Sequence, residues 1–192
     1  MKKIMYYCSS YQKEYVDFIS FCLINHKVPI VYGKKADIHF SETFLSHHKN
    51  NNNILAAVND YLLAYFETHF LDNIRGLCGY EIIRHFLDVN YSLFSNDDLF
   101  VPYLKFLKQH YPTKIKQISN KIAELSHDIF LKGYHKGKYD HTVRQFANYE
   151  LYFDTIHEIL FSFMLEHDNN KENIDKFKMM IKIFDASLKV MR

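Results

Sequence analysis

Regular helical spacing of apolar residues is the feature that most restricts the fold of this chain. Between Lys114 and Lys132, six apolar residues share one helix face, and the first five of them recur every three or four positions: Ile115, Ile118, Ile122, Leu125, Ile129 and Phe130. Such a stripe is normally buried against another element, because the opposite face of the helix is polar. The chain contains only 5 Gly and 3 Pro among 192 residues, too few for the many tight turns of an all-β fold. The sequence therefore predicts an all-α protein.

Three short helices are expected in the first fifty residues. Apolar residues have helical spacing over 15–23. Pro29 suits the first turn of a second short helix that reaches residue 35 or 36. Ser41 suits the N-cap or the start of a third segment that ends near His48.

Longer helices are expected in the rest of the chain. The asparagine run 50–53 interrupts the pattern and offers a cap for a long helix over 54–70. A stretch with two glycines and an aspartate, 133–141, is expected to be a loop. The remaining helices are expected over 75–89, 100–109, 114–132, 143–165 and 173–191.

The charge of the chain is distributed unevenly. Residues 1–56 contain 7 lysines and 4 acidic residues, a net charge of +3, whereas the remainder contains 17 basic and 18 acidic residues, a net charge of −1. A basic N-terminal part is compatible with attraction to nucleic acid. A part of the chain that is simply well solvated would have the same charge, so both interpretations stay open.

The cysteines and the hydropathy of the chain bear on its compartment. Cys8, Cys22 and Cys78 are scattered and include no C-x-x-C pair, which is typical of small buried residues in a reducing environment. No stretch approaches the roughly 20 apolar residues of a membrane span. Polar residues interrupt the N-terminal region, so it does not have the continuous apolar core of a signal peptide. We expect a cytoplasmic protein without membrane contact.

Three segments resemble the TetR family of bacterial transcriptional regulators. Residues 43–50, TFLSHHKN, resemble the pattern T-[FL]-Y-x-H-F-x-[NS] at the end of that family's recognition helix. Residues 54–58, ILAAV, resemble the LL-x-A-V start of its long fourth helix, and 129–139 resemble its I-x-x-G-x-x-x-G-x-[FIL] turn between two core helices. The resemblance covers the whole chain. It implies a three-helix helix-turn-helix head, residues 1–53, and a helical body for effector binding and dimerisation, residues 54–192.

The resemblance also implies a function. A protein of this kind is a dimeric regulator, usually a repressor, that binds a palindromic operator in double-stranded DNA. A small effector, here expected to be largely apolar or aromatic, releases or modulates it. The homodimer forms through the last two helices, and neither an enzymatic activity nor a cofactor is expected.

The resemblance places the DNA contacts in and beside the third segment. The residues expected to face the major groove or its flanking phosphates are Ser41, Thr43, Ser46 and His47. The residues expected to attract the DNA backbone are Lys34, Lys35 and Lys49. An alternative for the pair His47 and His48 is a partly buried position between the head and the fourth helix. The segment also departs from the family pattern, since Ser46 stands where a tyrosine is usual; a module without operator recognition is therefore a second hypothesis.

Aromatic residues are unusually frequent, with 17 Phe and 15 Tyr but no Trp. They can fill a helical core, and they also suit a roomy ligand cavity. The residues expected to line an effector site are Phe86, Tyr91, Phe94, Phe100, Tyr103, Phe106, Tyr149 and Phe153. The alternative for each of them is an ordinary place in the core.

A metalloenzyme is the third hypothesis. Glu124 and His127 form an E-x-x-H motif, and Asp154 and His157 form a D-x-x-H motif, so each pair shares a helix face. Ferritin-like bundles hold two irons with motifs of this kind, and Glu67 or Glu81 could complete the set. With 12 His and 22 acidic residues, however, such spacings also arise by chance. No G-x-S-x-G motif, glycine-rich phosphate loop or paired-cysteine zinc site occurs.

Overall fold

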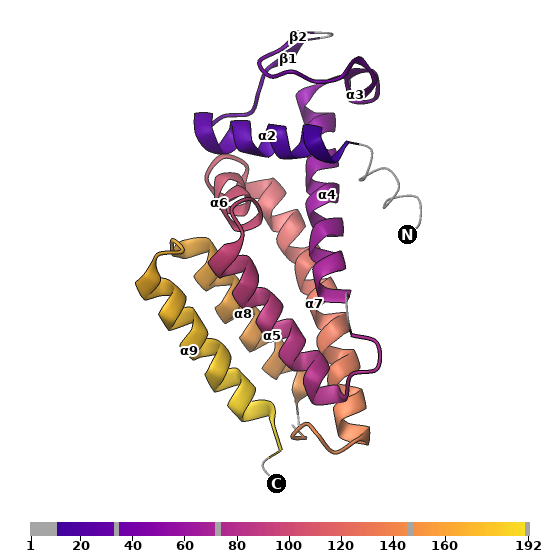
Figure 1. Ribbon diagram of the computed structural model, residues 1–192, viewed down its shortest axis with the longest axis vertical. Coiled ribbons are helices and arrows are strands. Elements are labelled where there is room, and N and C mark those ends of the chain that lie inside the picture. The colour runs from indigo at the N-terminus through magenta and orange to yellow at the C-terminus, as the bar shows by residue number, and fades with distance from the viewer. Residues whose placement is uncertain (1–10, 33–34, 72–73, 146–147, 191–192) are drawn as a thin grey trace. The chain divides into compact units, whose positions relative to one another are not determined.

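The computed structural model describes residues 11–32, 35–71, 74–145 and 148–190 (Figure 1). The elements, in chain order, are α2 (Gln12–Asn25), β1 (Val31–Tyr32), β2 (Lys35–Ala36), α3 (Glu42–His47), α4 (Asn51–Leu71), α5 (Gly79–Asn96), α6 (Phe100–His110), α7 (Pro112–Tyr139), α8 (Tyr149–Glu166) and α9 (Lys171–Leu188). Apart from one small hairpin the described chain is helical, which confirms the all-α class. None of the described helices combines the length and apolar character that a membrane crossing requires.

The chain divides into two compact units. Unit 1 comprises residues 1–66 and 98–118, and unit 2 comprises residues 67–97 and 119–192. Unit 1 includes a later piece of the chain because α6 packs against α2. The division into a head of residues 1–53 and a body of residues 54–192 stays a prediction; its boundary falls inside the first turn of α4.

The prediction of a second short helix over 29–36 is wrong. The chain there forms an antiparallel hairpin in which Val31 pairs with Ala36 and Tyr32 with Lys35. The amide of Ile30 donates to the Asp37 carboxylate at 3.1 Å, and the amide of Val31 donates to Asn51 Oδ1 at 2.9 Å. Ile30 and Val31 are β-branched and favour extended backbone, and polar side chains from outside the strands satisfy their amides. The expected three-helix head is therefore not present in this stretch.

Asparagine and serine side chains define where the next two helices begin. Ser41 Oγ accepts a hydrogen bond from the amide of Phe44 at 3.2 Å and caps α3. Asn50 Oδ1 accepts one from the amide of Asn53 at 3.0 Å in the first turn of α4. Both helix starts use the polar residues that the sequence offered as caps.

The core of unit 1 is built around α2 and α6. Phe18, Ile19 and Cys22, from the expected stripe on α2, are fully buried. Tyr103 of α6 is also fully buried, and its hydroxyl donates to Asn59 Oδ1 of α4 at 3.4 Å. A buried tyrosine hydroxyl thus keeps a partner, as the low polarity of a protein interior requires.

The prediction of a loop over 133–141 is wrong for most of that stretch, because α7 continues to Tyr139. Its glycines are needed for close packing rather than for a turn. A Cβ added at Gly79 of α5 would lie 1.8 Å from the backbone nitrogen of Gly137, and one at Gly133 would lie 2.7 Å from Ile83 Cγ1. Since no side chain fits, α5 and α7 approach within unit 2 at the distance of their backbones.

The N-terminus of α5 is capped by residues that follow α7. The amide of Gly79 donates to Asp140 Oδ2 at 2.9 Å, and the amide of Tyr80 donates to Thr142 Oγ1 at 3.1 Å. These bonds satisfy two of the amides that the first turn of a helix leaves without a partner inside the helix. At the same end of unit 2, the Tyr80 hydroxyl donates to Asp185 Oδ1 of α9 at 2.7 Å.

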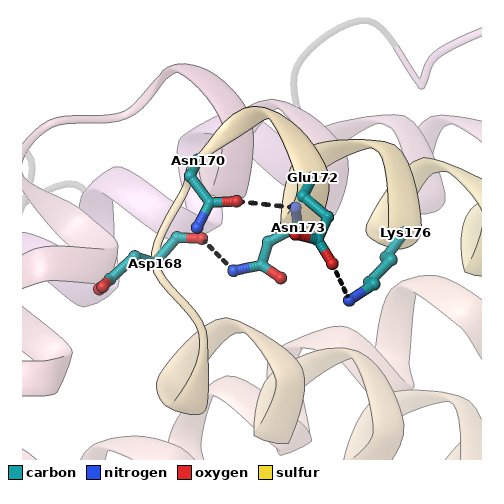
Figure 2. A network of polar contacts seen from close by, with 5 residues as sticks. All are labelled: Asp168, Asn170, Glu172, Asn173 and Lys176. Carbon is teal, nitrogen blue, oxygen red and sulfur yellow. Dashed lines mark hydrogen bonds and ion pairs between the residues drawn. The ribbon is translucent and has the colours of Figure 1, made fainter.

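Helices α8 and α9 of unit 2 are joined by a short polar turn (Figure 2). Asn170 Oδ1 accepts from the amide of Asn173 at 3.0 Å, and Asn173 Nδ2 donates to the carbonyl of Asp168 at 3.0 Å. Lys176 Nζ donates to Glu172 Oε1 at 2.6 Å one turn along α9. This cap starts the helix at Lys171, slightly before the expected residue 173. The turn returns the chain so that α9 packs against α8 and α5.

Candidate nucleic-acid interface

The candidate interface is α3, a helix of 6 residues that is held to unit 1 from one side. Its cap, Ser41, accepts from Phe44 and also donates from Oγ to Glu14 Oε1 of α2 at 2.9 Å. An isolated helix of this length does not persist in water, because few of its backbone bonds form within the helix. The position of α3 therefore depends on its contacts with the rest of unit 1.

A cluster of aromatic rings supplies those contacts. Phe44 of α3 is fully buried, with its ring centroid 4.7 Å from that of Phe40 and 4.6 Å from that of His48. The rings of Tyr11, the residue before α2, and of Tyr15 in α2 meet the Phe44 ring edge to face at 5.4 Å and 5.7 Å. These five residues are referred to below as the head ring cluster. Its edge-to-face and stacked contacts fix the orientation of α3 about its own axis.

His48 belongs to this cluster rather than to the exposed face. It is half-buried, and its Nε2 lies 3.5 Å from the Tyr15 hydroxyl. Burial, together with the neighbouring imidazole of His47, lowers the pKa of His48 below its usual value. The packed position considered for the histidine pair thus applies to His48, with the rings of α2 as its neighbours.

Most of the residues expected to contact DNA are exposed in or just after α3. Thr43, Ser46 and His47 are exposed along α3, and Lys49 is exposed just after it. Ser41 is half-buried and engaged as the cap. The side chains of two other expected residues are not described: Lys34 lies outside the described residues, and of Lys35 only the backbone is described.

The imidazole of His47 is held against its own helix. Its Nδ1 lies 2.8 Å from the carbonyl oxygen of Thr43, and also 3.3 Å from the Ser46 hydroxyl and 3.3 Å from the Tyr11 hydroxyl. Ser46 Oγ donates to the same Thr43 carbonyl at 2.7 Å. Two of the exposed polar side chains are thus oriented by backbone bonds before any ligand arrives.

Two residues that support this face were not anticipated from the sequence. Tyr11 lies four positions before Tyr15, so it continues the apolar stripe of α2, and this spacing could have revealed it. Glu14 bonds to Ser41, which is 27 positions away, and no local pattern indicates such a pair.

The residues expected to line an effector site are divided between the units. Unit 2 contains Phe86, Tyr91, Phe94, Tyr149 and Phe153, and unit 1 contains Phe100, Tyr103 and Phe106. Six of the eight are buried, while Tyr91 and Tyr149 are half-buried.

Within each unit these side chains pack against other rings. In unit 2 the rings of Phe86 and Phe153 lie 6.2 Å apart, whereas Phe94 packs at 4.8 Å on Phe177 of α9. In unit 1, Phe100 stacks at 5.6 Å on Phe66, and Tyr103 stacks at 5.9 Å on Phe106. Every one of these contacts is an ordinary core contact, and the effector site stays a prediction.

The residues of the metalloenzyme hypothesis differ in exposure and in the groups they contact. Glu124 and Asp154 are exposed, whereas His157 is stacked between Phe153 and Phe161, at 5.7 Å and 5.5 Å. Burial lowers the pKa of His157 to about 4. Among the described residues, no three His, Cys, Asp or Glu side chains come close enough to hold a metal ion.

The two described cysteines, Cys22 and Cys78, differ in their surroundings. Cys22 is fully buried in unit 1, and burial raises the pKa of its thiol to about 12. The raised pKa disfavours the thiolate, which is the reactive form of cysteine. Cys78 is half-buried immediately before α5, where its amide donates to Glu81 Oε2 at 2.8 Å.

Comparison with known proteins gave no relatives: no family model, no curated protein and no solved structure matches the chain.

Proposed function

We propose that this protein is a DNA-binding transcriptional regulator of the TetR type, in which α3 contacts the DNA. The observation that carries the proposal is the two-sided character of α3. One side is fixed by Phe44 in the head ring cluster, and the other exposes hydroxyls, an imidazole and the lysine at position 49. A protein reads DNA by holding such groups rigidly enough to enter a groove.

The net charge of the N-terminal part of the sequence is compatible with contact with a polyanion, although α3 itself begins with the exposed Glu42. The first 56 residues have a net charge of +3. Lys13 of α2 and Lys49 are both exposed in unit 1. Lysines of this kind provide attraction to phosphates that does not depend on base sequence and that weakens as salt rises.

A homodimer through α8 and α9 is part of the proposal, because a palindromic operator needs two copies of α3. Large apolar side chains are exposed on both helices: Leu151 is 62% and Ile159 41% exposed on α8, and Met179 is 58% and Ile183 60% exposed on α9. Burying them against a second copy would remove apolar surface from water. Sedimentation of the purified protein measures whether two copies associate.

The test of the proposal is a mobility-shift titration with a duplex that covers the DNA upstream of the protein's own coding sequence. We expect a discrete shift that weakens strongly between about 50 mM and 200 mM salt, since phosphate contacts release counterions. Thr43→Ala and Lys49→Ala should each weaken the shift, while Lys132→Ala on α7 serves as the control at an exposed lysine outside both α3 and the proposed dimer helices. Absence of any shift at the lower salt concentration would contradict the proposal.

The second candidate is a binding module of the same fold that does not recognise an operator. The hairpin at 31–36 favours it, because a helix-turn-helix needs a helix there to support the recognition helix. The short length of α3 favours it as well, since 6 residues span less than two turns. The same titration, repeated with an unrelated duplex, separates the two candidates: a module of this kind would bind both duplexes equally weakly.

A further inference from the structure

Helix α8 carries a ridge of negative charge. Its sequence contains four acidic residues and no lysine or arginine. Three of the four, Glu150, Asp154 and Glu158, are exposed and recur every four residues, so they lie along one ridge of the helix. Like charges at this spacing repel one another. An opposite charge from outside the helix would therefore stabilise the ridge.

The acidic ridge lies on the side of α8 away from α9. Tyr152 marks the side that faces α9, because its hydroxyl shares a hydrogen bond with that of Ser187. Glu150 and Asp154 are two residues before and two residues after Tyr152, which places them about 200° around the helix from it. Glu158 continues the ridge one turn later. The ridge is thus one edge of the exposed face that α8 and α9 form together.

The other edge of this face is basic. Asp185 marks the side of α9 that faces α5, because it accepts a hydrogen bond from the Tyr80 hydroxyl. Four exposed lysines share this side of α9 and its C-cap, since they lie close to whole helical turns from Asp185: Lys171, Lys178, Lys182 and Lys189. Asp175 offsets one of these charges, and Glu172 and Lys176 are bonded to each other. The edge therefore keeps an excess of positive charge.

Exposed apolar side chains lie between the two edges. Ile159 follows Tyr152 by seven residues, so it lies on the α9 side of α8. Ile183 precedes Ser187 by four residues, so it lies on the α8 side of α9. They are 41% and 60% exposed, and Met179, one turn before Ile183, is 58% exposed. An apolar strip between edges of opposite charge is complementary to itself, which favours a second copy of the same face as its partner.

The charges select one orientation of the second copy. A two-fold axis parallel to the helices places the acidic edge of each copy on the basic edge of the other, whereas a two-fold axis across the helices places like edges together. Heights along the helices agree with the first arrangement. Tyr152 and Ser187 are level because they are bonded. Glu158 lies six residues after the former and Lys182 five before the latter, so the antiparallel helices place both at the same height to within about 1.5 Å.

We propose that two copies associate through this face about a two-fold axis parallel to α8 and α9, so that α8 of each copy packs on α9 of the other and Glu158 faces Lys182 of the second copy. The inference rests on the homodimer within the proposed function, and it names the pairing of the helices and the charged contact that selects it. Because the axis repeats the contact, each dimer contains it twice.

The test measures self-association by sedimentation at about 50 mM salt, where exposed charges are only weakly screened. Glu158→Lys and Lys182→Glu should each weaken the dimer about tenfold, because each places like charges opposite one another at both contacts. An equimolar mixture of the two variants should associate about as tightly as the wild type, because every contact in the mixed dimer joins opposite charges. The variant with both substitutions should regain self-association for the same reason.

Lys132→Glu on α7 is the matched control, since it makes the same change in net charge at an exposed lysine outside this face. It should leave self-association unchanged, and mixing it with Glu158→Lys should not restore the dimer. Circular dichroism confirms that each variant remains folded.

The outcomes separate the inference from the proposed function. If the wild type sediments as a monomer, or if the mixture associates no more tightly than its two components, the pairing is refuted, and DNA binding is judged by the mobility shift alone. If the mixture restores the dimer while the wild type shifts no duplex, the pairing stands and the proposed operator binding fails. Restoration confined to the mixture and the double variant supports the inference.

Discussion

Two helix attachments in this protein differ in kind. In unit 2, α5 meets α7 backbone to backbone, and Gly79 and Gly137 leave no room for even one additional carbon. In unit 1, α3 is attached through the rings of the head ring cluster and one serine cap. Backbone contact at glycines allows almost no adjustment, whereas a few rings and one cap constrain a helix of 6 residues much less strongly.

The two attachments also differ in how many contacts restrict the helix. The α5–α7 contact also includes caps from Asp140 and Thr142 on the first turn of α5, so both packing and hydrogen bonds restrict it. The attachment of α3 leaves one face of the helix exposed. The orientation of α3 thus depends on fewer contacts than that of α5, and the exposed face is open to a ligand.

The largest effect is expected when the glycine contact is broken. In Gly79→Ala the new Cβ would meet the backbone of Gly137 at 1.8 Å and 2.1 Å, and the carbonyl of Gly133 at 2.5 Å. Backbone cannot rotate away as a side chain can, so we expect a loss of more than about 3 kcal/mol in the free energy of unfolding. Urea unfolding followed by circular dichroism measures it.

Gly76→Ala is the control for this change. Gly76 has φ +86° and no atom within 4 Å of an added Cβ, so alanine there meets backbone strain but no clash. We expect a loss of about 1 kcal/mol. Equal effects of the two substitutions would show that the contact between α5 and α7 is looser than the geometry indicates.

The next effect concerns the half-buried imidazole of His157 in unit 2. Burial lowers the pKa of His157 from 6.5 to about 4, so the folded state binds its proton only at lower pH than the unfolded state does. The stability contribution of neutral His157 is therefore complete above pH 6.5 and is lost as the pH falls from there towards 4. The loss amounts to about 3 kcal/mol over this window.

Urea unfolding between pH 7.5 and 4 measures this dependence against two variants. His157→Phe keeps a ring between Phe153 and Phe161 and should have a flatter pH profile than the wild type. His135→Gln, at an exposed histidine of the same unit, should retain the wild-type profile. If His157→Phe has the same profile as the wild type, His157 does not carry the acid sensitivity of unit 2.

The smallest effect is expected at the attachment of α3. Ser41→Ala removes the cap on Phe44 and the partner of Glu14, at a cost of about 1 kcal/mol. Because the loss is local, hydrogen exchange of the amides of residues 44–48 should accelerate about fivefold while exchange in unit 2 stays unchanged. Ser46→Ala, at an exposed serine of the same helix, is the control and should leave exchange nearly as in the wild type. Equal acceleration in both variants would argue against the cap.

The candidate interface could be predicted from the sequence only in part. The spacing and residue types of 43–49 placed three polar side chains on one exposed face, because helical periodicity is a local property. The pattern did not separate His47 from His48, although one is exposed and the other lies among rings. That distinction depends on Tyr15 of another helix, whose ring contacts His48, since Tyr11 contacts both imidazoles.

The sequence by itself determined the all-α class, the caps at Ser41 and Asn50 and the stripe on α2, since each of these depends on residues within a few positions. The backbone conformation of two segments was decided by tertiary contacts alone. The stretch 29–36 became a hairpin whose first strand bonds to Asn51, and residues 133–139 stayed helical because their glycines meet α5. In both cases the deciding partner lies at least 20 residues away in sequence, beyond the reach of local propensity.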